Sequence, residues 1–386
     1  MERTIQEKLS KVPDYRIGNA IRHKLSDILM IGLLTFLCNG DGYAAMRVFG
    51  LTHEEELGKY LELPNGIPSQ DTFEHVFAKL NPKALSSVLR EYLSDLKVEA
   101  LNNGCSKMLV GIDGKTLQGS KGLGKKAKHI VTAFASELRL VLGEVATEEK
   151  SNEITAIPKL LEMFCKKDMI ITIDAMGTQT DIADAIIDKK ANYVLSVKKN
   201  QPTLWNDISL AMEELEYSAT KAYKAKMKEA GLYERTTEKS HGRYEVRECY
   251  INSDISLLST ACDWRGITGF GMIVSRREEL SKPDKIPSIN REYFIYSIDA
   301  TSAAEMLYIK RTHWSIENNL HWCLDVILRE DSSRARLDNS PENLNILRKE
   351  ALCLVRADDS FNASAKAKIY RCSLCLDYAL TVAGVK

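Results

Sequence analysis

The stretch VGIDGKTLQGSKG, residues 110–122, begins as an apolar strand and ends in a basic turn that contains Gly114, Lys115 and Thr116. It looks like a phosphate-binding loop, but such a loop needs a glycine five residues before the Gly-Lys-Thr glycine so that backbone N–H groups can wrap the phosphates. That position is Leu109, inside the predicted strand, so a nucleotide-binding loop is disfavoured. The chemistry of the stretch then depends on Asp113, the carboxylate that follows the apolar run.

The chain around this stretch has the composition of an ordinary folded protein. It has 386 residues, 44% hydrophobic and 27% charged, and 53 basic residues balance 53 acidic ones. Zero net charge argues against nucleic-acid binding by overall attraction. The longest apolar run, residues 28–38, is too short to cross a membrane, and residues 1–12 carry no apolar segment of a secretory signal. We therefore expect a cytoplasmic protein without membrane partners, and its nine scattered cysteines fit a reducing compartment.

Residues 1–100 are predicted to form a helical N-terminal domain. The segment 21–38 has the length of a helix, and Thr52 with Glu55 makes a capping box that predicts another helix start. The turn 64–70 precedes a further short helix. Three short helices around a turn are compatible with a helix-turn-helix DNA reader and equally with a helical support domain.

Residues 105–340 change to an α/β pattern of apolar strands and amphipathic helices. This order predicts a mixed sheet with helices packed on it. Residues 202–300 contain a helical lead-in and several strands, which indicates a β-rich insertion, and residues 341–386 are predicted to be packing helices. Before the insertion, the expected strands are 107–113, 129–137, 140–148, 168–174 and 192–199, and the expected helices are 154–165 and 180–190.

Two of these strands end in the same way, with Asp113 after LVGI and Asp174 after IITI. The carboxyl ends of parallel strands meet where loops open a crevice, and two carboxylates there would repel each other unless a cation lies between them. Hard oxygen ligands suit Mg²⁺ or Mn²⁺, and a pair of such ions supports phosphodiester chemistry. For either aspartate alone, a turn or helix cap is the commoner role.

A third carboxylate is expected from the helix THWSIENNLHWCLDV, residues 312–326. It contains Glu317, with His313 and His321 one turn away on each side and Asp325 a further turn along. A spacing of four residues places these side chains on one helix face. The pattern differs from that of a zinc protease, in which the glutamate directly follows the first histidine.

The alternative for this helix is structural. Trp314 and Trp322 could anchor a buried polar network that contains the two histidines and the glutamate. The residues of the helix alone favour neither interpretation.

Basic residues gather next to Asp113 although the chain is neutral overall. Lys115, Lys121, Lys125, Lys126 and Lys128 follow it with no acidic residue among them, and Lys198 and Lys199 form a second basic spot. These are either two solvated loops or a cationic rim that contacts phosphates. Charge alone does not decide, but the position beside Asp113 keeps the second interpretation open.

Several stretches together resemble a known family. In the family's order the chain carries IDGKTLQGS, EKSNEITAIPKLLE, ITIDAMGTQ, YVLSVKKNQPTL, SHGRYEVR, THWSIENNLHWCLDV and LREDSSRAR. Over residues 105–350 it resembles the DDE transposases of ISAs-type bacterial insertion sequences, a group that includes the H-repeat-associated proteins. DYRIGNAIRHKLSDILMIGLLTFLCNGDGY, residues 14–43, is similar to the family's N-terminal associated domain.

The resemblance implies a ribonuclease-H-like catalytic core with a β-rich insertion before the helix that carries the glutamate. It implies that Asp113, Asp174 and Glu317 bind Mg²⁺ or Mn²⁺ as the catalytic triad of a DNA-cleaving and strand-transferring transposase. The expected partners are the DNA of the element ends and of the target, with the protein acting as a homodimer or larger assembly at the nucleoid. The rival functions are a retained, inactive relative that binds DNA or protein, and a stand-alone nuclease.

The resemblance also suggests which residues contact DNA. Lys115 becomes a candidate phosphate contact, Asn200 and Gln201 could position DNA, and His241, Gly242 and Arg243 match an insertion motif that forms a DNA contact or a turn. Two features depart from the family or superfamily pattern: Gln118 replaces a usual arginine, and Leu324 stands where a lysine would fall. The supporting candidates are His313, His321 and Asp325, and the DNA-binding candidates are Lys115, Lys121, Lys125, Lys126, Lys198, Asn200, Gln201 and Arg243.

Overall fold

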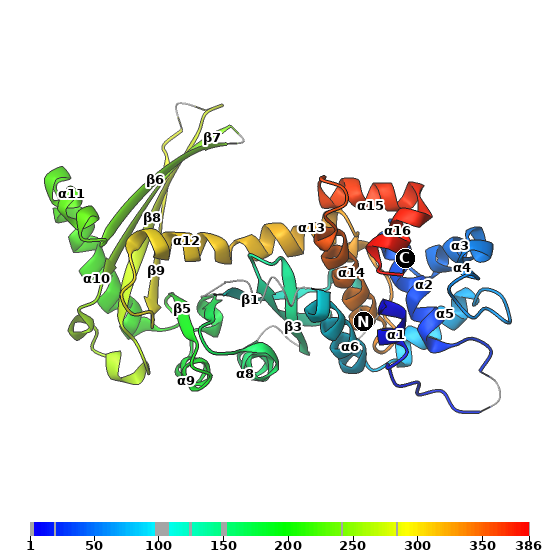
Figure 1. Ribbon diagram of the computed structural model, residues 1–386. Helices are drawn as coiled ribbons and strands as arrows, with labels where there is room; N and C mark the ends of the chain where they lie inside the picture. Colours follow the sequence, from blue (N-terminus) through cyan, green and yellow to red (C-terminus); the bar gives the residue numbers. More distant parts are fainter. Residues whose placement is uncertain are drawn as a thin grey trace.

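The computed structural model describes residues 4–18, 21–96, 108–122, 126–147, 153–240, 242–282 and 285–385 (Figure 1). A long mixed sheet occupies the middle and one end of the molecule, and a helical unit forms the other end. None of the helices in these ranges is both long enough and apolar enough to span a membrane.

The helical unit joins the two ends of the chain. Its C-terminal helices share one hydrophobic core with the N-terminal ones, so residues of both predicted helical regions pack as one body. The division of the chain at residues 340 and 341 stays a prediction. The helices of this unit are α1 (Ile5–Leu9), α2 (Leu25–Leu37), α3 (Tyr43–Thr52), α4 (Glu54–Leu57), α5 (Gln70–Lys79), α6 (Pro82–Leu96), α14 (Ser340–Ala357), α15 (Ala365–Leu374) and α16 (Leu376–Val382).

The predicted capping box at Thr52 is wrong. Helix α3 continues through Thr52, whose hydroxyl donates a hydrogen bond of 2.8 Å to the carbonyl of Val48. A residue in helical conformation cannot take the extended backbone of an N-cap. Helix α4 instead begins at Glu54, with His53 as an N-cap that makes no side-chain hydrogen bond.

The sheet has nine strands in the order β3-β2-β1-β4-β5-β9-β8-β7-β6. Its first five form the ribonuclease-H-like core that the family resemblance implies: β1, β4 and β5 run parallel, and β2 and β3 are antiparallel to their neighbours. The core strands are β1 (Leu109–Thr116), β2 (His129–Ala135), β3 (Leu140–Thr147), β4 (Ile170–Ile173) and β5 (Asn192–Val197), and the helices between them are α8 (Glu153–Phe164) and α9 (Thr180–Asp188).

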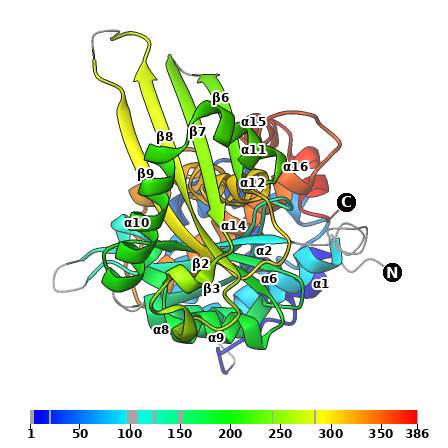
Figure 2. The ribbon, with the colours of Figure 1, turned by 90° about the vertical axis from the view of Figure 1, so that its left-hand side faces the viewer.

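The insertion extends this same sheet. Strand β9 pairs antiparallel with β5, and β8, β7 and β6 follow by antiparallel pairing. Figures 1 and 2 show these long strands rising away from the core, with α10 and α11 beside them. The insertion consists of α10 (Pro202–Ser218), α11 (Lys221–Glu229), β6 (Tyr233–Ser240), β7 (Arg243–Asn252), β8 (Gly269–Glu279) and β9 (Ser288–Tyr296).

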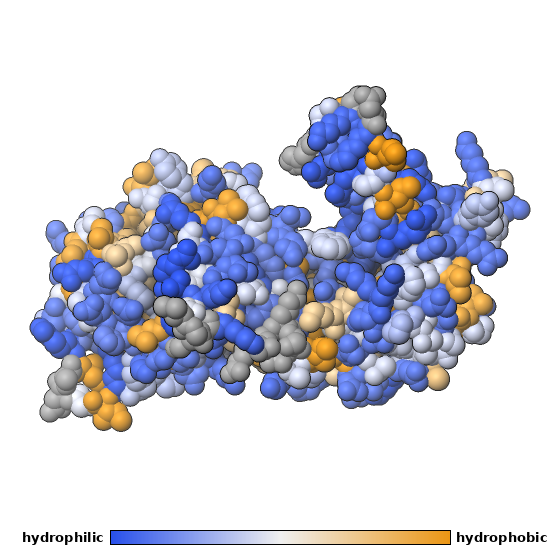
Figure 3. Space-filling view, turned by 180° about the vertical axis from the view of Figure 1, so that it is seen from behind, coloured by the Kyte–Doolittle hydropathy of each residue, from blue (hydrophilic) through white to orange (hydrophobic). Residues whose placement is uncertain are grey.

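Helices cover both faces of the core sheet because its strands are apolar on both faces. Helices α8 and α9 pack on one face, and α12 (Ala303–His313) crosses the other. The chain continues from α12 through the π-helical turn η6 (Glu317–His321) to α13 (Trp322–Val326), which leads back to the helical unit. Seen from behind, a wide hollow separates the insertion from the helical unit, and its walls are mostly hydrophilic (Figure 3).

Candidate active site

The parallel pairing of β1 with β4 brings the two strand-end aspartates together. Ile112 pairs with Ile173, so Asp113 and Asp174 are the next residues on adjacent strands. Both line a pocket of about 420 Å³, and Glu317 lines it from the helix side. The three predicted triad residues, which come from three separate segments, therefore border one cavity.

Asp113 is largely enclosed. Its Oδ1 accepts a hydrogen bond of 2.8 Å from the backbone N–H of Gly114. Burial, together with the charges of Glu317 and Asp174, raises the pKa of Asp113 to about 6, although His321 and the hydrogen bond from Gly114 act to lower it. The negative charge of Asp113 is thus poorly compensated by the protein, which is the condition that favours a bound cation.

Glycine is required beside Asp113 because two side chains approach the backbone there. A Cβ at Gly114 would lie 2.4 Å from Oε1 of Glu153 and 2.4 Å from Nε2 of His129. These two buried groups bond to each other at 2.6 Å, and Nδ1 of His129 lies 2.9 Å from the hydroxyl of Thr116. Sequence reasoning missed this pair, although Glu153 lies within the stretch EKSNEITAIPKLLE.

Asp174 caps a short helix and also lines the pocket. Its Oδ1 accepts a hydrogen bond of 3.1 Å from Met176 and so caps the short helix η3 (Ala175–Gly177). Asn200 donates to the carbonyl of Ala175 at 2.7 Å, and Gln201 donates to that of Thr178 at 2.9 Å. These two amides hold the loop after Asp174, and their predicted role in positioning DNA stays a prediction.

Glu317 and His321 converge on Asp113. Nδ1 of His321 lies 3.4 Å from Oδ2 of Asp113 and 3.6 Å from Oε2 of Glu317. One ligand atom from each of these residues lies within 4.8 Å of the others, so the three side chains fit around a single ion. The hydrogen bond from His321 holds the pKa of Glu317 below its usual value, and the Glu317 side chain remains 54% exposed.

His313 has a different place. It lines the pocket, but its Nδ1 lies 2.8 Å from the hydroxyl of Thr172 on β4. Burial, assisted by the charge of Lys310, lowers the pKa of His313 to about 3, so the ring is neutral. Lys310 was missed at the sequence level: its buried ammonium donates to Ser196 at 2.5 Å, beneath the same pocket.

The tryptophans of this helix do not anchor a buried network. Trp314 and Trp322 are each 53% exposed, whereas His313 and His321 are buried. The structural alternative for the helix is wrong in this respect, because the apolar face is formed by residues such as Ile316 and Leu320.

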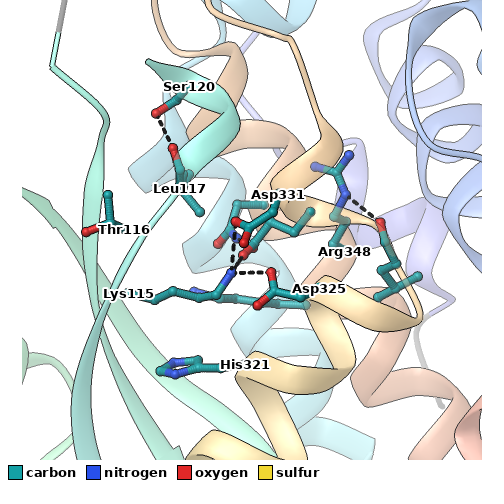
Figure 4. Close-up of polar contacts among 12 residues, drawn as sticks. Lys115, Thr116, Leu117, Ser120, His321, Asp325, Asp331 and Arg348 are labelled. Carbon is teal, nitrogen blue, oxygen red and sulfur yellow. Dashed lines mark hydrogen bonds and ion pairs between the residues drawn. The ribbon is translucent and has the colours of Figure 1, made fainter.

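Lys115 points into the protein (Figure 4). Its ammonium lies 2.5 Å from Oδ1 of Asp325 and 3.6 Å from Oδ1 of Asp331, and it also pairs with Glu330. The Lys115 side chain is only 14% exposed. Lys115 thus has three carboxylate partners, and its contact with a phosphate stays a prediction. Asp325 has a lysine partner away from the triad.

The remaining basic candidates lie at the surface. Lys121, Lys126 and Lys198 are exposed, and Lys198 also lines the pocket of the three acids. Lys125 lies outside the described residues.

Two residues of the predicted motif, Gly242 and Arg243, lie at the hairpin between β6 and β7. Gly242 has a φ of 72°, a left-handed conformation that suits glycine, and exposed Arg243 pairs with Ser240 across the hairpin. His241 lies outside the described residues. A turn at Gly242 agrees with the structure, and a DNA contact by Arg243 stays a prediction.

Comparison with known proteins places this geometry in context. Residues 106–355 match the family described as "Transposase DDE domain", and residues 6–93 match the family described as "DDE_Tnp_1-associated". The chain is 34% identical to the Escherichia coli protein named "H repeat-associated putative transposase YhhI", covering 98% of this chain and 97% of that one. It is 37% identical to "Putative transposase YncI" of Escherichia coli, covering 95% and 90%.

Among solved structures, the chain is similar to the piggyBac transposase in its synaptic complex with hairpin DNA, with a TM-score of 0.43 and 13% identity. The match covers 99% of this chain and 77% of that one, and a TM-score this low indicates a distant likeness.

Proposed function

The chain belongs to the transposase family with a DDE domain, and we propose that it cuts DNA at the ends of an insertion sequence and joins the freed ends to a target. The observation that carries this proposal is the convergence of Asp113, Asp174 and Glu317 on one pocket. Within the described ranges, the salt bridges of these acids involve His321 and no lysine or arginine. Their charge therefore calls for a cation from outside the chain.

Asp113 and Asp174 would hold Mg²⁺ or Mn²⁺ from the sheet, and Glu317 would hold it from the helix. Bound ions of this kind stabilise the charge on phosphoryl oxygens and activate the attacking oxygen. Oxygen ligands suit these ions, and the nitrogen of His321 would favour Mn²⁺ over Mg²⁺. Asn200 and Gln201 would keep Asp174 in place by holding the loop that follows it.

The proposed reaction uses the same residues twice. Water first attacks a phosphodiester at the element end, a P–O bond forms, and the opposite P–O bond breaks to release a 3′-OH. That hydroxyl then attacks a target phosphodiester in line and releases a second 3′-OH. No covalent bond to a protein side chain forms in either step, so the chain needs to position ligands and DNA more than it needs a nucleophile.

DNA would approach through the hydrophilic hollow between the insertion and the helical unit. Lys198 at the pocket and Lys121 and Lys126 on the loop after β1 are exposed cations suited to phosphate contacts. We further propose that a homodimer or larger assembly holds the two element ends.

The test is cleavage of a duplex that carries the element end with its flanking DNA, in Mg²⁺ or Mn²⁺. Wild type should cut it and Asp174→Ala should not, while Asp181→Ala, an exposed acid on the next helix, should cut normally. Folded wild-type protein that binds the duplex without cutting it would contradict the proposal and favour a retained DNA-binding relative.

A second substrate separates transposition from simple hydrolysis. A pre-cut end with a free 3′-OH should become joined to a target plasmid in the presence of the metal ion. Cutting of the first substrate without joining of the second would indicate a nuclease.

A further inference from the structure

A second acidic cluster is formed by residues that follow Glu317 in the sequence. Asp325, Glu330 and Asp331 each place a carboxylate oxygen within 4.8 Å of the other two. Three carboxylates this close would repel one another strongly without a cation. The chain supplies that cation as the ammonium of Lys115 (Figure 4).

The ammonium contacts all three carboxylates of this cluster. It donates hydrogen bonds to Asp325 at 2.5 Å and to Glu330, whose side chain is only 2% exposed, and Oδ1 of Asp331 lies 3.6 Å away. These contacts hold the Lys115 ammonium in one place.

The cluster is also fixed from behind by helix α14. Asn345 donates a hydrogen bond to Glu330, and Nε of Arg348 donates to the carbonyl of Leu328 at 3.2 Å. Both α14 residues are buried in the helical unit. Helix α14 thus holds Glu330 and the backbone just before it.

Lys115 and Asp113 both connect strand β1 to the helical segment that follows α12. They are two residues apart on β1, so their side chains lie on one face of the strand. On the helical side, Asp113 meets Glu317 and His321, and Lys115 meets Asp325, eight residues beyond Glu317. We infer that Lys115 is a positioning residue whose pairing with the second acidic cluster fixes the register that brings Glu317 to Asp113.

This inference rests on the proposed function, because it assigns Lys115 to the metal-binding geometry of that site. A phosphate contact is the competing role. To reach DNA, however, the ammonium would have to leave all three carboxylates and expose their mutual repulsion, since its side chain is 14% exposed as it stands.

The experiment compares Lys115→Met with Lys121→Met, an exposed lysine on the following loop. Two quantities are measured on folded protein without any turnover: Mn²⁺ binding, followed by electron paramagnetic resonance, and duplex binding in EDTA at several salt concentrations. Asp113→Asn defines the fraction of Mn²⁺ bound at the triad.

We expect Lys115→Met to weaken Mn²⁺ binding at the triad by about tenfold or more, as is usual when a group that orients metal ligands is lost. Its duplex binding should stay unchanged. Lys121→Met should show the opposite pattern. Asp325→Asn and Asp331→Asn, which keep the lysine, form a graded series that tests the same pairing if Lys115→Met does not fold, with the larger loss expected for the nearer carboxylate.

Wild-type Mn²⁺ affinity in Lys115→Met would overturn the positioning role and leave the proposed function standing. Weakened duplex binding with a reduced salt dependence in that variant would overturn it in favour of a phosphate contact. Absence of Asp113-dependent Mn²⁺ binding in wild type would overturn the inference and the proposed metal site together.

Discussion

Two acidic clusters lie side by side where β1 meets the helix that follows α12, and they differ in their source of positive charge. Asp325, Glu330 and Asp331 surround Lys115, so the chain neutralises them itself. Asp113, Asp174 and Glu317 have His321 as their only salt-bridge partner among the described residues. On the proposed function, the same strand and helix would therefore carry one structural contact and one site for a cation.

The largest effect is expected from breaking the cluster of Asp113, Asp174 and Glu317. Asp113→Asn should lower DNA cleavage about a thousandfold or more, because bound metal ions supply several kcal/mol of transition-state stabilisation. Duplex binding should persist, which a gel-shift assay in EDTA can check. Asp325→Asn, a matched change in the neutralised cluster, should cost far less activity, and equal losses in the two variants would contradict the comparison.

The pH dependence of stability should sharpen the comparison between the two acidic clusters. The pKa of Asp113 is about 6 in the folded protein, above the ordinary value of 3.8, so between these pH values the folded state keeps a proton that the unfolded state has lost. Without metal, stability should therefore fall as pH rises from about 4 to 7, by about 2–3 kcal/mol from this group. Urea unfolding in EDTA would show this slope in wild type and a shallower one in Asp113→Asn. Equal slopes of stability against pH in wild type and Asp113→Asn would contradict the raised pKa of Asp113.

Loss of one charge should lower the free energy of unfolding more in the cluster around Lys115 than at an ordinary surface ion pair. Glu330→Gln removes the negative charge and replaces one of the two buried oxygens that accept from Lys115 and Asn345, and we expect a loss of about 1–3 kcal/mol in the free energy of unfolding. The control is Glu279→Gln at the exposed pair with Lys285, where little change in stability is expected because exposed ion pairs contribute little. Similar losses of unfolding free energy in urea titrations of the two variants would contradict the description of Lys115 as held by the buried cluster.

The smallest effect concerns the exposed lysine nearest the triad. Lys198→Ala should leave unfolding unchanged and reduce the slope of log affinity against log salt by about one, since one phosphate contact is lost. Fluorescence anisotropy with a labelled duplex at several salt concentrations measures this slope. A loss of thermal stability would instead indicate that Lys198 has a structural role.

Features that depend on local pattern could be predicted from the sequence. Apolar runs that end in Asp113 and Asp174 indicated parallel strands with carboxylates at one edge, and the structure has both in one pocket. The histidine spacing around Glu317 was only partly informative. His313 bonds to Thr172, whereas His321, at the end of the π-helical turn, faces Asp113. Neither the turn nor the bond to Thr172 has a sequence signal.

Features that depend on distant partners could not be predicted. Lys115 looked like a phosphate contact because its neighbours in sequence are basic, but its partner Asp325 is 210 residues away. The pairing of β9 with β5 likewise depends on which edge is free once the core sheet has formed. Thr52 carried a valid capping pattern that was overridden when α3 continued through it.

That pairing has a consequence for anyone who shortens the chain. Deleting residues 202–300 would strip β5 of its neighbour and expose a row of unpaired N–H and C=O groups on an apolar strand. Such an edge recruits other chains, so the truncated protein should aggregate. Trimming is safer from the opposite border, where the outer edge of β6 is already open in the described structure and the hairpin with β7 can be cut back from its tip.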